Sequence, residues 1–220
     1  MTPALLFDLD GTLTDPRVGI VRCIQHALGR LARPCPPEAE LAACIGPPLR
    51  GTFGHLLATS DRELIERAMA LYRERFAVVG LYENEVYAGV RGMLDGLHGR
   101  RMFVATSKPA VFAERIVRHF ALDHHFAGVY GPDLDGRWDD KTDLLAHLLA
   151  SERLAAEDAV MIGDRHADIV AATANGMRSI GALWGYGSRE ELLEAGADAV
   201  CAVPADLSAC LARGLSLREG

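Results

Sequence analysis

Short apolar runs that end in turn residues recur along this chain and alternate with helical patterns, and this alternation limits the possible folds more than any other feature. A short apolar run bounded by turn signals is typical of a buried strand. Strands that alternate with helices form a parallel sheet with helices on both faces. The sequence therefore predicts an α/β fold with a Rossmann-like core. The six predicted strands are Ala4 to Phe7, Met102 to Ala105, Gly128 to Tyr130, Ala159 to Ile162, Ser179 to Ala182 and Ala199 to Val203.

Between the first and second strands, residues 15–87 show only helical patterns. The pair Asp15-Pro16 suits the N-cap and first turn of a helix. The capping box Ser60-x-x-Glu63 predicts the start of a long helix that lasts until Gly80. We therefore expect an all-helical cap domain at residues 15–87, inserted into a core made of residues 1–14 and 88–220.

Charge and cysteine content exclude several classes of protein. The chain of 220 residues has a formal net charge of −7, whereas a general nucleic-acid-binding surface is basic. Its five cysteines are odd in number and lack the spacing of a zinc site, so we expect no disulfide framework and no zinc centre. No apolar run approaches the roughly 20 residues of a membrane-spanning helix, and the N-terminus does not resemble a signal peptide. We expect a cytoplasmic monomer or homodimer without nucleic-acid or membrane partners.

Carboxylates follow two of the predicted strands. Asp8 and Asp10 follow the first strand, and Asp164 follows a later one with Asp168 four residues further on. Ligand sites of parallel sheets lie at the carboxyl ends of the strands, so we expect these side chains to gather there. Gathered carboxylates repel one another unless a cation lies among them, and hard oxygen donors suit Mg²⁺. The sequence predicts a Mg²⁺ site at these four aspartates, with Lys141 as a further counter-charge.

Such a site suits phosphoryl transfer through an aspartyl-phosphate. In this hypothesis, Asp8 attacks phosphorus, and Asp10 protonates the leaving alcohol and later deprotonates the hydrolytic water. Lys141 offsets the negative charge, and Thr106 holds phosphoryl oxygens. Taken singly, each residue is more often a turn, a cap or a surface residue. Their joint occurrence in this order favours catalysis.

Lysine is rare in this chain, since Lys108 and Lys141 are the only two among 23 basic residues. A compact ammonium and a planar guanidinium fit different sites, so both lysines are candidate site residues, and Lys108 either contacts substrate or lies on the rim. Thr12 and Ser107 are further candidate substrate contacts. Arg50, in the predicted cap, either binds an anionic end of the substrate or is a solvated residue at a helix start.

Four segments resemble the motifs of the haloacid dehalogenase superfamily, in the expected order. They are FDLDGTLTD at 7–15, ATSKP at 105–109, Lys141 and MIGDRHADI at 161–169. The helical insertion resembles the cap of that superfamily, so the resemblance covers nearly the whole chain. It implies Asp8 as nucleophile and Asp10 as acid and base, with the Asp10 backbone carbonyl also at Mg²⁺. It further implies Thr106 and Lys141 as phosphate contacts, and Asp164 and Asp168 as metal ligands.

Three other segments resemble the phosphoglycolate-phosphatase-like branch, some of whose members act as nucleotidases. We expect hydrolysis of a small-molecule phosphate monoester, with phosphoglycolate favoured. The alternatives are 5′-nucleotidase action on nucleoside monophosphates and a sugar-phosphate mutase reaction. Metal-free dehalogenases lack a second carboxylate such as Asp10, and phosphonate hydrolases use a cap lysine that residues 15–87 lack. The three segments are IGPPLR at 45–50, ENEVYAGV at 83–90 and GALWGYGSREELLEAGAD at 181–198.

Two function classes outside this superfamily compete with these expectations. A signalling receiver domain also uses Asp, Mg²⁺, Thr and Lys on a parallel sheet, but its acceptor aspartate lies on a middle strand and no helical insertion follows its first strand. A silent scaffold on the same fold would be expected to have lost at least one motif residue, and this chain keeps them all. Both classes are therefore disfavoured.

Overall fold

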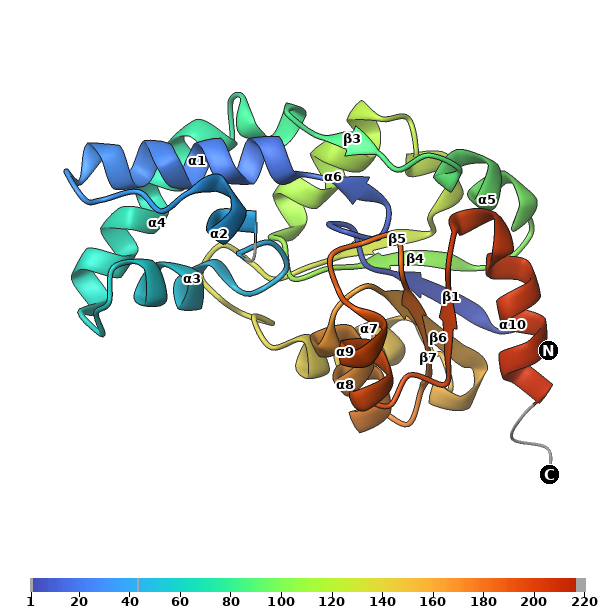
Figure 1. Ribbon diagram of the computed structural model, residues 1–220. Coiled ribbons are helices and arrows are strands. Elements are labelled where there is room, and N and C mark those ends of the chain that lie inside the picture. Colours follow the sequence, from blue (N-terminus) through green and yellow to red (C-terminus); the bar gives the residue numbers. More distant parts are fainter. Residues whose placement is uncertain (1, 43, 217–220) are drawn as a thin grey trace. The chain divides into compact units, whose positions relative to one another are not determined.

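The computed structural model describes residues 2–42 and 44–216. Its main sheet has six parallel strands in the order β5-β4-β1-β6-β7-β8 (Figure 1). The predicted α/β fold with a parallel sheet and an inserted helical segment is confirmed. The strands are β1 (Ala4–Phe7), β4 (Met102–Ala105), β5 (Gly128–Tyr130), β6 (Ala159–Gly163), β7 (Arg178–Ala182) and β8 (Ala199–Cys201).

The order of the strands determines which face of the sheet each helix covers. The chain moves from β1 to β4 and β5, then returns to β6 on the other side of β1 and continues to β7 and β8. Because crossovers between parallel strands are right-handed, this reversal places α5 and α6 on one face and α7, α8 and α9 on the other (Figure 1). A last helix, α10, contacts α5. The bounds are α5 (Val90–Gly96), α6 (Ala110–His119), α7 (Lys141–Glu152), α8 (His166–Ala174), α9 (Arg189–Glu194) and α10 (Leu207–Ser216).

Strand β1 lies inside the sheet because all four of its residues are apolar and buried. Leu6 is in register with Phe103 of β4 and Met161 of β6, and these side chains pack with Leu145 and Leu148 of α7. Since the direction of winding reverses on the two sides of β1, the crossovers diverge at its carboxyl end. A ligand site is expected at such a switch point.

Residues 16–85 form a second compact unit, separate from the unit that contains the main sheet. Within it, α1 packs on α4. The Tyr72 ring stacks on Phe76 with centroids 5.3 Å apart, and meets Phe53 edge to face at 6.2 Å. Its elements are α1 (Arg17–Arg30), α2 (Glu38–Ala42), α3 (Leu49–Leu56), α4 (Arg62–Phe76) and the 3-10 turn η1 (Gly80–Tyr82).

Two short strands carry the chain out of the sheet-bearing unit and back into it. They are β2 (Thr14–Asp15) and β3 (Glu85–Val86), which pair with each other. The prediction that Asp15 caps α1 is wrong, because Asp15 belongs to β2 and Pro16 stands at the N-cap without a side-chain hydrogen bond. The Asp15 carboxylate instead accepts a hydrogen bond from the Tyr186 hydroxyl. A partner far along the chain has replaced the local cap.

Both ends of α4 also differ from the prediction. The carboxylate of Asp61, rather than the Ser60 hydroxyl, accepts hydrogen bonds from the backbone N–H groups of Glu63 and Leu64 at 3.0 and 3.4 Å. A carboxylate is favoured there because its charge also complements the helix dipole. The helix ends at Phe76, before Gly80, which packs so close to Cys23 that no Cβ would fit.

The helices are short, and the longest of those described, α4, has 15 residues. None of the helices within residues 2–42 and 44–216 combines the length and apolar character that crossing a membrane requires.

Candidate active site

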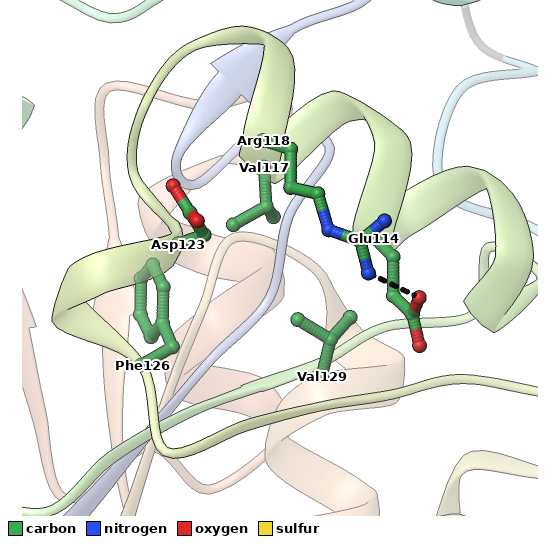
Figure 2. Close-up of a pocket in the computed structure, with 6 residues that line it drawn as sticks. All are labelled: Glu114, Val117, Arg118, Asp123, Phe126 and Val129. Atoms are coloured by element: carbon green, nitrogen blue, oxygen red, sulfur yellow. Dashed lines mark hydrogen bonds and ion pairs between the residues drawn. The ribbon is translucent and has the colours of Figure 1, made fainter.

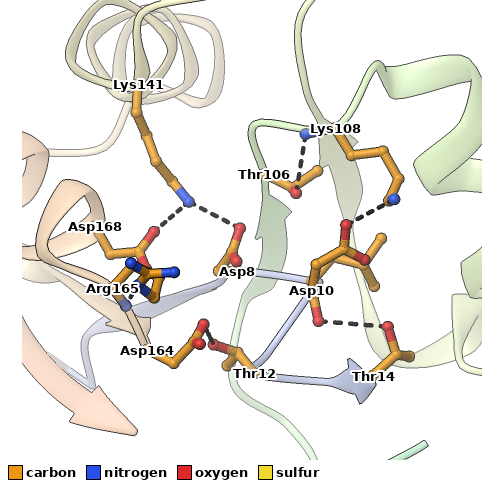
Figure 3. Close-up of polar contacts among 11 residues, drawn as sticks. Asp8, Asp10, Thr12, Thr14, Thr106, Lys108, Lys141, Asp164, Arg165 and Asp168 are labelled. Atoms are coloured by element: carbon orange, nitrogen blue, oxygen red, sulfur yellow. Dashed lines mark hydrogen bonds and ion pairs between the residues drawn. The ribbon is translucent and has the colours of Figure 1, made fainter. Parts of the chain in front are cut away.

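Three strand ends bring the predicted residues of the sheet-bearing unit together (Figure 3). Asp8 directly follows β1, while Thr106 and Asp164 directly follow β4 and β6. Since β1 pairs with both of these strands, the three side chains meet at one edge of the sheet. Asp10 comes two residues after Asp8 in the same loop. The predicted gathering of these residues at the strand ends is what the structure shows.

Lys141 reaches this edge because α7 begins at it. The Asp140 carboxylate caps the helix by accepting from the backbone N–H groups of Thr142 and Asp143 at 2.7 and 3.2 Å. The cap makes Lys141 the first helical residue, with its side chain buried. Its ammonium donates to Asp8 Oδ1 at 2.8 Å and also pairs with Asp168 Oδ1. Lys141 therefore bridges two carboxylates.

Asp8, Asp164 and Asp168 form a buried acidic cluster. One oxygen from each lies within 4.8 Å of the others, and the three residues are 6%, 0% and 2% exposed. Burial, followed by the charges of Asp168 and Asp8, raises the pKa of Asp164 well above its ordinary value. Burial also raises the pKa of Asp168, although Lys141 opposes the shift. The pKa of Lys141 is raised by the two carboxylates in spite of its burial.

The charges of this cluster fit a divalent cation. Three carboxylates face one ammonium, so the ionised cluster carries an excess negative charge in a buried place, which is costly without a further cation. All three offer hard oxygen donors, which suit Mg²⁺ better than soft metals. Asp8, Asp164 and Asp168 are thus consistent with the metal site of a phosphoryl-transfer enzyme.

Glycines make room for these carboxylates. Gly11 has a φ of +94°, and a Cβ built on it would overlap the Asp164 carboxylate. A Cβ on Gly163, the last residue of β6, would overlap Asp168 in the same way. Only residues without a side chain allow the backbone to pass this close to the cluster.

The Asp10 side chain lies outside the acidic cluster and faces Lys108 instead. The Lys108 ammonium lies 2.6 Å from Asp10 Oδ2, and both side chains are largely buried. The other oxygen, Oδ1, is buried and has no hydrogen-bond partner among the described residues. Burial raises the pKa of Asp10 even though Lys108 lowers it. The two neighbouring aspartates of this loop thus have different cations and different surroundings.

The remaining predicted substrate contacts of the sheet-bearing unit differ in burial and in hydrogen-bond partners. Thr12 is fully buried, and its hydroxyl donates to Asp164 Oδ1 at 3.1 Å, so it orients an acidic side chain rather than facing solvent. The Thr106 hydroxyl accepts from the Lys108 backbone N–H at 3.2 Å. Ser107, between them in sequence, is partly exposed. Thr106, Ser107 and Lys108 form the turn that follows β4.

Arg50, the predicted contact from the inserted segment, lies in the first turn of α3. Its guanidinium forms an ion pair with Glu66 of α4, and both side chains are 43% exposed. The structure thus gives Arg50 a carboxylate partner within its own unit. Any anionic group that bound Arg50 would compete with that partner.

Sequence reasoning used residues 181–198 only for the resemblance to a branch of the superfamily and gave no site role to the segment 183–187, which packs against the site. The Trp184 indole N–H donates to the Thr12 carbonyl at 2.8 Å, and the Tyr186 backbone N–H donates to Asp164 Oδ2 at 2.9 Å. Gly185 and Gly187 lie so close to Asp164 that a Cβ on either would overlap it. Two glycines and two aromatic residues directly after a predicted strand were the available signal.

A separate hollow lies over α6 and β5 (Figure 2), and none of the predicted site residues lines it. Its volume is about 200 Å³, and two of its lining residues, Arg118 and Glu114, form an ion pair at 3.0 Å. None of the acidic residues described above lines it. The lining residues are Glu114, Val117, Arg118, Asp123, Phe126 and Val129.

A parallel sheet with a helical insertion after its first strand and an Asp-Lys cluster at the strand ends defines a class of phosphoryl-transfer hydrolases. Residues 5–182 match the family described as haloacid dehalogenase-like hydrolase. The chain belongs to this family, as its motifs predicted, and it is a phosphatase of the haloacid dehalogenase type.

Relatives within this family carry different activities. The chain is 51% identical over 192 residues to a 5′-nucleotidase of Pseudomonas aeruginosa, covering 86% of each. It is 41% identical over 186 residues to tyrosine-protein kinase PtkA of Mycobacterium tuberculosis, covering 83% of this chain and 62% of that protein. It is 32% identical over 191 residues to a phosphoglycolate phosphatase of Xanthomonas campestris pv. campestris, covering 83% and 84%.

Among solved structures, the fold is similar to the crystal structure of "a predicted phosphatase" from Clostridium acetobutylicum. The two share 36% sequence identity with a TM-score of 0.92, over 97% of this chain and 99% of that one. The similarity therefore extends over the sheet-bearing unit and the insertion alike.

Proposed function

We propose that this phosphatase hydrolyses nucleoside 5′-monophosphates with Mg²⁺, through a covalent intermediate on Asp8. The observation that carries the chemistry is the contrast between two neighbouring carboxyl groups. Asp8 is held by Lys141 at the edge of the acidic cluster, whereas burial raises the pKa of Asp10. A carboxylate held by an ammonium suits a nucleophile, and a carboxyl group with a raised pKa suits a general acid.

The choice of substrate departs from the phosphoglycolate favoured by the sequence motifs. The similarity to a 5′-nucleotidase is much greater than the similarity to a phosphoglycolate phosphatase, and it supports the nucleotide alternative. Phosphoglycolate remains the second candidate.

In the first half-reaction, a carboxylate oxygen of Asp8 forms a bond to phosphorus as the bond from phosphorus to the ester oxygen breaks. Asp10 gives its proton to that departing oxygen, which leaves as the alcohol. Lys141 offsets the charge of Asp8 and of the phosphoryl group, and Thr106 donates to a phosphoryl oxygen. Lys108 holds Asp10 Oδ2 before substrate binds.

In the second half-reaction, the Asp10 carboxylate takes a proton from water as the water oxygen bonds to phosphorus. The bond from phosphorus to the Asp8 oxygen breaks, which releases inorganic phosphate and restores the Asp8 carboxylate. Asp8, Asp164, Asp168 and the Asp10 backbone carbonyl would hold Mg²⁺, whose positive charge stabilises the phosphoryl oxygens during transfer. We assign catalysis to the sheet-bearing unit and substrate selection to a cap at residues 16–85.

Hydrolysis of a panel of phosphate esters by the purified protein tests this function. We expect nucleoside 5′-monophosphates to give the highest kcat/KM, with phosphoglycolate below them. A sugar-phosphate isomer as the product would indicate a mutase. If phosphoglycolate exceeded every nucleotide, the substrate proposal would be wrong while the phosphatase assignment stood.

Removal of Mg²⁺ is expected to abolish turnover, and its return to raise the melting temperature. A cation among three buried carboxylates relieves their repulsion, and a ligand that binds only the folded state stabilises it. Ca²⁺ should bind but oppose turnover, because it prefers more ligands and longer bonds. Thermal unfolding and phosphate release, each with EDTA, Mg²⁺ and Ca²⁺, check this. Asp164→Asn is the control and should reduce the Mg²⁺-dependent rise in melting temperature; full turnover in EDTA would contradict the proposed mechanism.

Replacement of Arg50 tests its role in specificity. We expect Arg50→Ala to lower kcat/KM for the best nucleotide at least tenfold, about 1.4 kcal/mol, and to affect p-nitrophenyl phosphate much less. Interactions with remote parts of a substrate assist the chemical step. Glu66→Gln removes the competing carboxylate and should preserve or increase kcat/KM for the nucleotide. Equal losses on both substrates would place Arg50 at the transferring phosphate.

A further inference from the structure

Two residues of the segment 183–187, Trp184 and Tyr186, contact three functional places. Trp184 donates to the carbonyl of Thr12, in the loop that follows Asp8 and Asp10. The Tyr186 backbone N–H donates to Asp164, and the Tyr186 hydroxyl donates to Asp15. One residue thus holds an acidic ligand of the candidate metal site and a residue 171 positions away in sequence.

Asp15 lies where the chain passes from the sheet-bearing unit into the insertion. It is the last residue of the sheet-bearing unit, which resumes at Val86 after the insertion. It lies in β2, whose pairing with β3 joins the outgoing and returning chains. Backbone hydrogen bonds from Gly11 to Thr14 at 2.8 Å and from Tyr87 to Leu13 at 3.2 Å fix the chain just before this point. The Asp15 side chain is therefore attached to the last residue before the insertion begins.

The packing of the segment leaves little freedom at Tyr186. Gly185 and Gly187, its neighbours on both sides, approach Asp164 and the Gly11 carbonyl too closely for any Cβ. The backbone of Tyr186 is thereby held against the acidic cluster, while its ring extends to β2. A displacement of Asp15 would have to stretch or break the contact to a residue that is itself fixed at the cluster.

We propose that Tyr186 is a positioning residue. It connects Asp15, the last residue before the inserted unit, to the loop that holds Asp164. Through its hydroxyl it fixes β2, from which the chain enters the residues to which substrate selection is assigned above. The inference rests on the proposed function for its choice of substrate, but the hydrogen bond itself does not depend on that choice. A merely stabilising hydrogen bond would affect all substrates equally.

Tyr186→Phe removes the hydroxyl and keeps the backbone N–H that holds Asp164. We expect kcat/KM for adenosine 5′-monophosphate to fall at least tenfold, while kcat/KM for p-nitrophenyl phosphate stays within threefold of wild type. Tyr130→Phe is the matched control, because it removes another phenol-to-carboxylate hydrogen bond of the same unit, to Glu152 at 2.6 Å. The control should preserve the ratio of the two kcat/KM values.

A double-mutant cycle tests whether Tyr186 acts through Asp15. Asp15→Ala should reproduce the effect of Tyr186→Phe, and the double variant should be no worse than the more impaired single variant, within twofold. Asp15→Asn retains an acceptor oxygen and should restore part of the activity lost in Asp15→Ala. Multiplicative losses in the double variant would show that the two residues act independently and would overturn the inference.

Hydrogen exchange supplies a readout that does not use turnover. With Mg²⁺ present, the amides of Gly11 and Tyr87 should exchange faster in Tyr186→Phe than in wild type, while those of β6 are unchanged. Equal exchange in the two proteins would also overturn the inference. A wild-type protein inactive on the nucleotide would refute the proposed substrate instead, and the exchange experiment would still decide the role of Tyr186.

Discussion

Asp8→Asn is expected to yield a folded protein whose phosphatase turnover falls to background, a loss of roughly 10³-fold or more. The amide has the shape of the carboxylate but is not a nucleophile, so no covalent intermediate can form. Its oxygen can still accept from Lys141, which donates to Asp8 at 2.8 Å in the structure. The measurement is phosphate release from a nucleotide and from p-nitrophenyl phosphate.

Thermal unfolding distinguishes this loss of chemistry from a loss of structure. The charge of Asp8 contributes to the raised pKa values of Asp164 and Asp168, so a neutral amide relieves repulsion in the cluster. We therefore expect the melting temperature in EDTA to be maintained or to rise. Asp10→Asn is the comparison and should slow both half-reactions by roughly 100-fold or more, as for the loss of a general acid and base. An Asp8 variant with a tenth of wild-type turnover would exclude the covalent mechanism.

Lys141→Arg is expected to damage turnover nearly as much as Lys141→Ala, in spite of the conserved charge. The ammonium is buried between Asp8 and Asp168 and contacts both. A guanidinium is larger and planar, and it cannot enter that space without displacing one of the carboxylates. The kcat values of the two variants, measured with saturating Mg²⁺, check this expectation.

The second lysine provides the control for this substitution. Lys108 pairs with the Asp10 carboxylate and does not lie between Asp8 and Asp168, and a guanidinium can also pair well with a carboxylate. Lys108→Arg should therefore lose much less turnover than Lys141→Arg. An active Lys141→Arg enzyme would show that an ammonium is not required between Asp8 and Asp168, in a chain whose other basic residues are mostly arginine.

The fold and the centre of the site were predictable because both depend on local patterns and on one rule of topology. The run from Ala4 to Phe7 is apolar and bounded by turn residues. This local pattern predicts a buried strand without any knowledge of the rest of the fold. Carboxyl ends of parallel strands meet at one edge. That rule alone brings Asp8, Thr106 and Asp164 together from three distant parts of the chain.

Only the tertiary structure decided which partner each polar side chain takes. Asp15 has the sequence pattern of a helix cap but accepts from Tyr186, and Thr12 donates to Asp164 from 152 positions away. Arg50 is paired with Glu66, which changes what it can offer to a substrate. Periodicity and turn signals report the conformation of neighbouring residues. A hydrogen bond between distant residues depends on how whole elements pack, and a buried polar group takes the partner that packing places beside it.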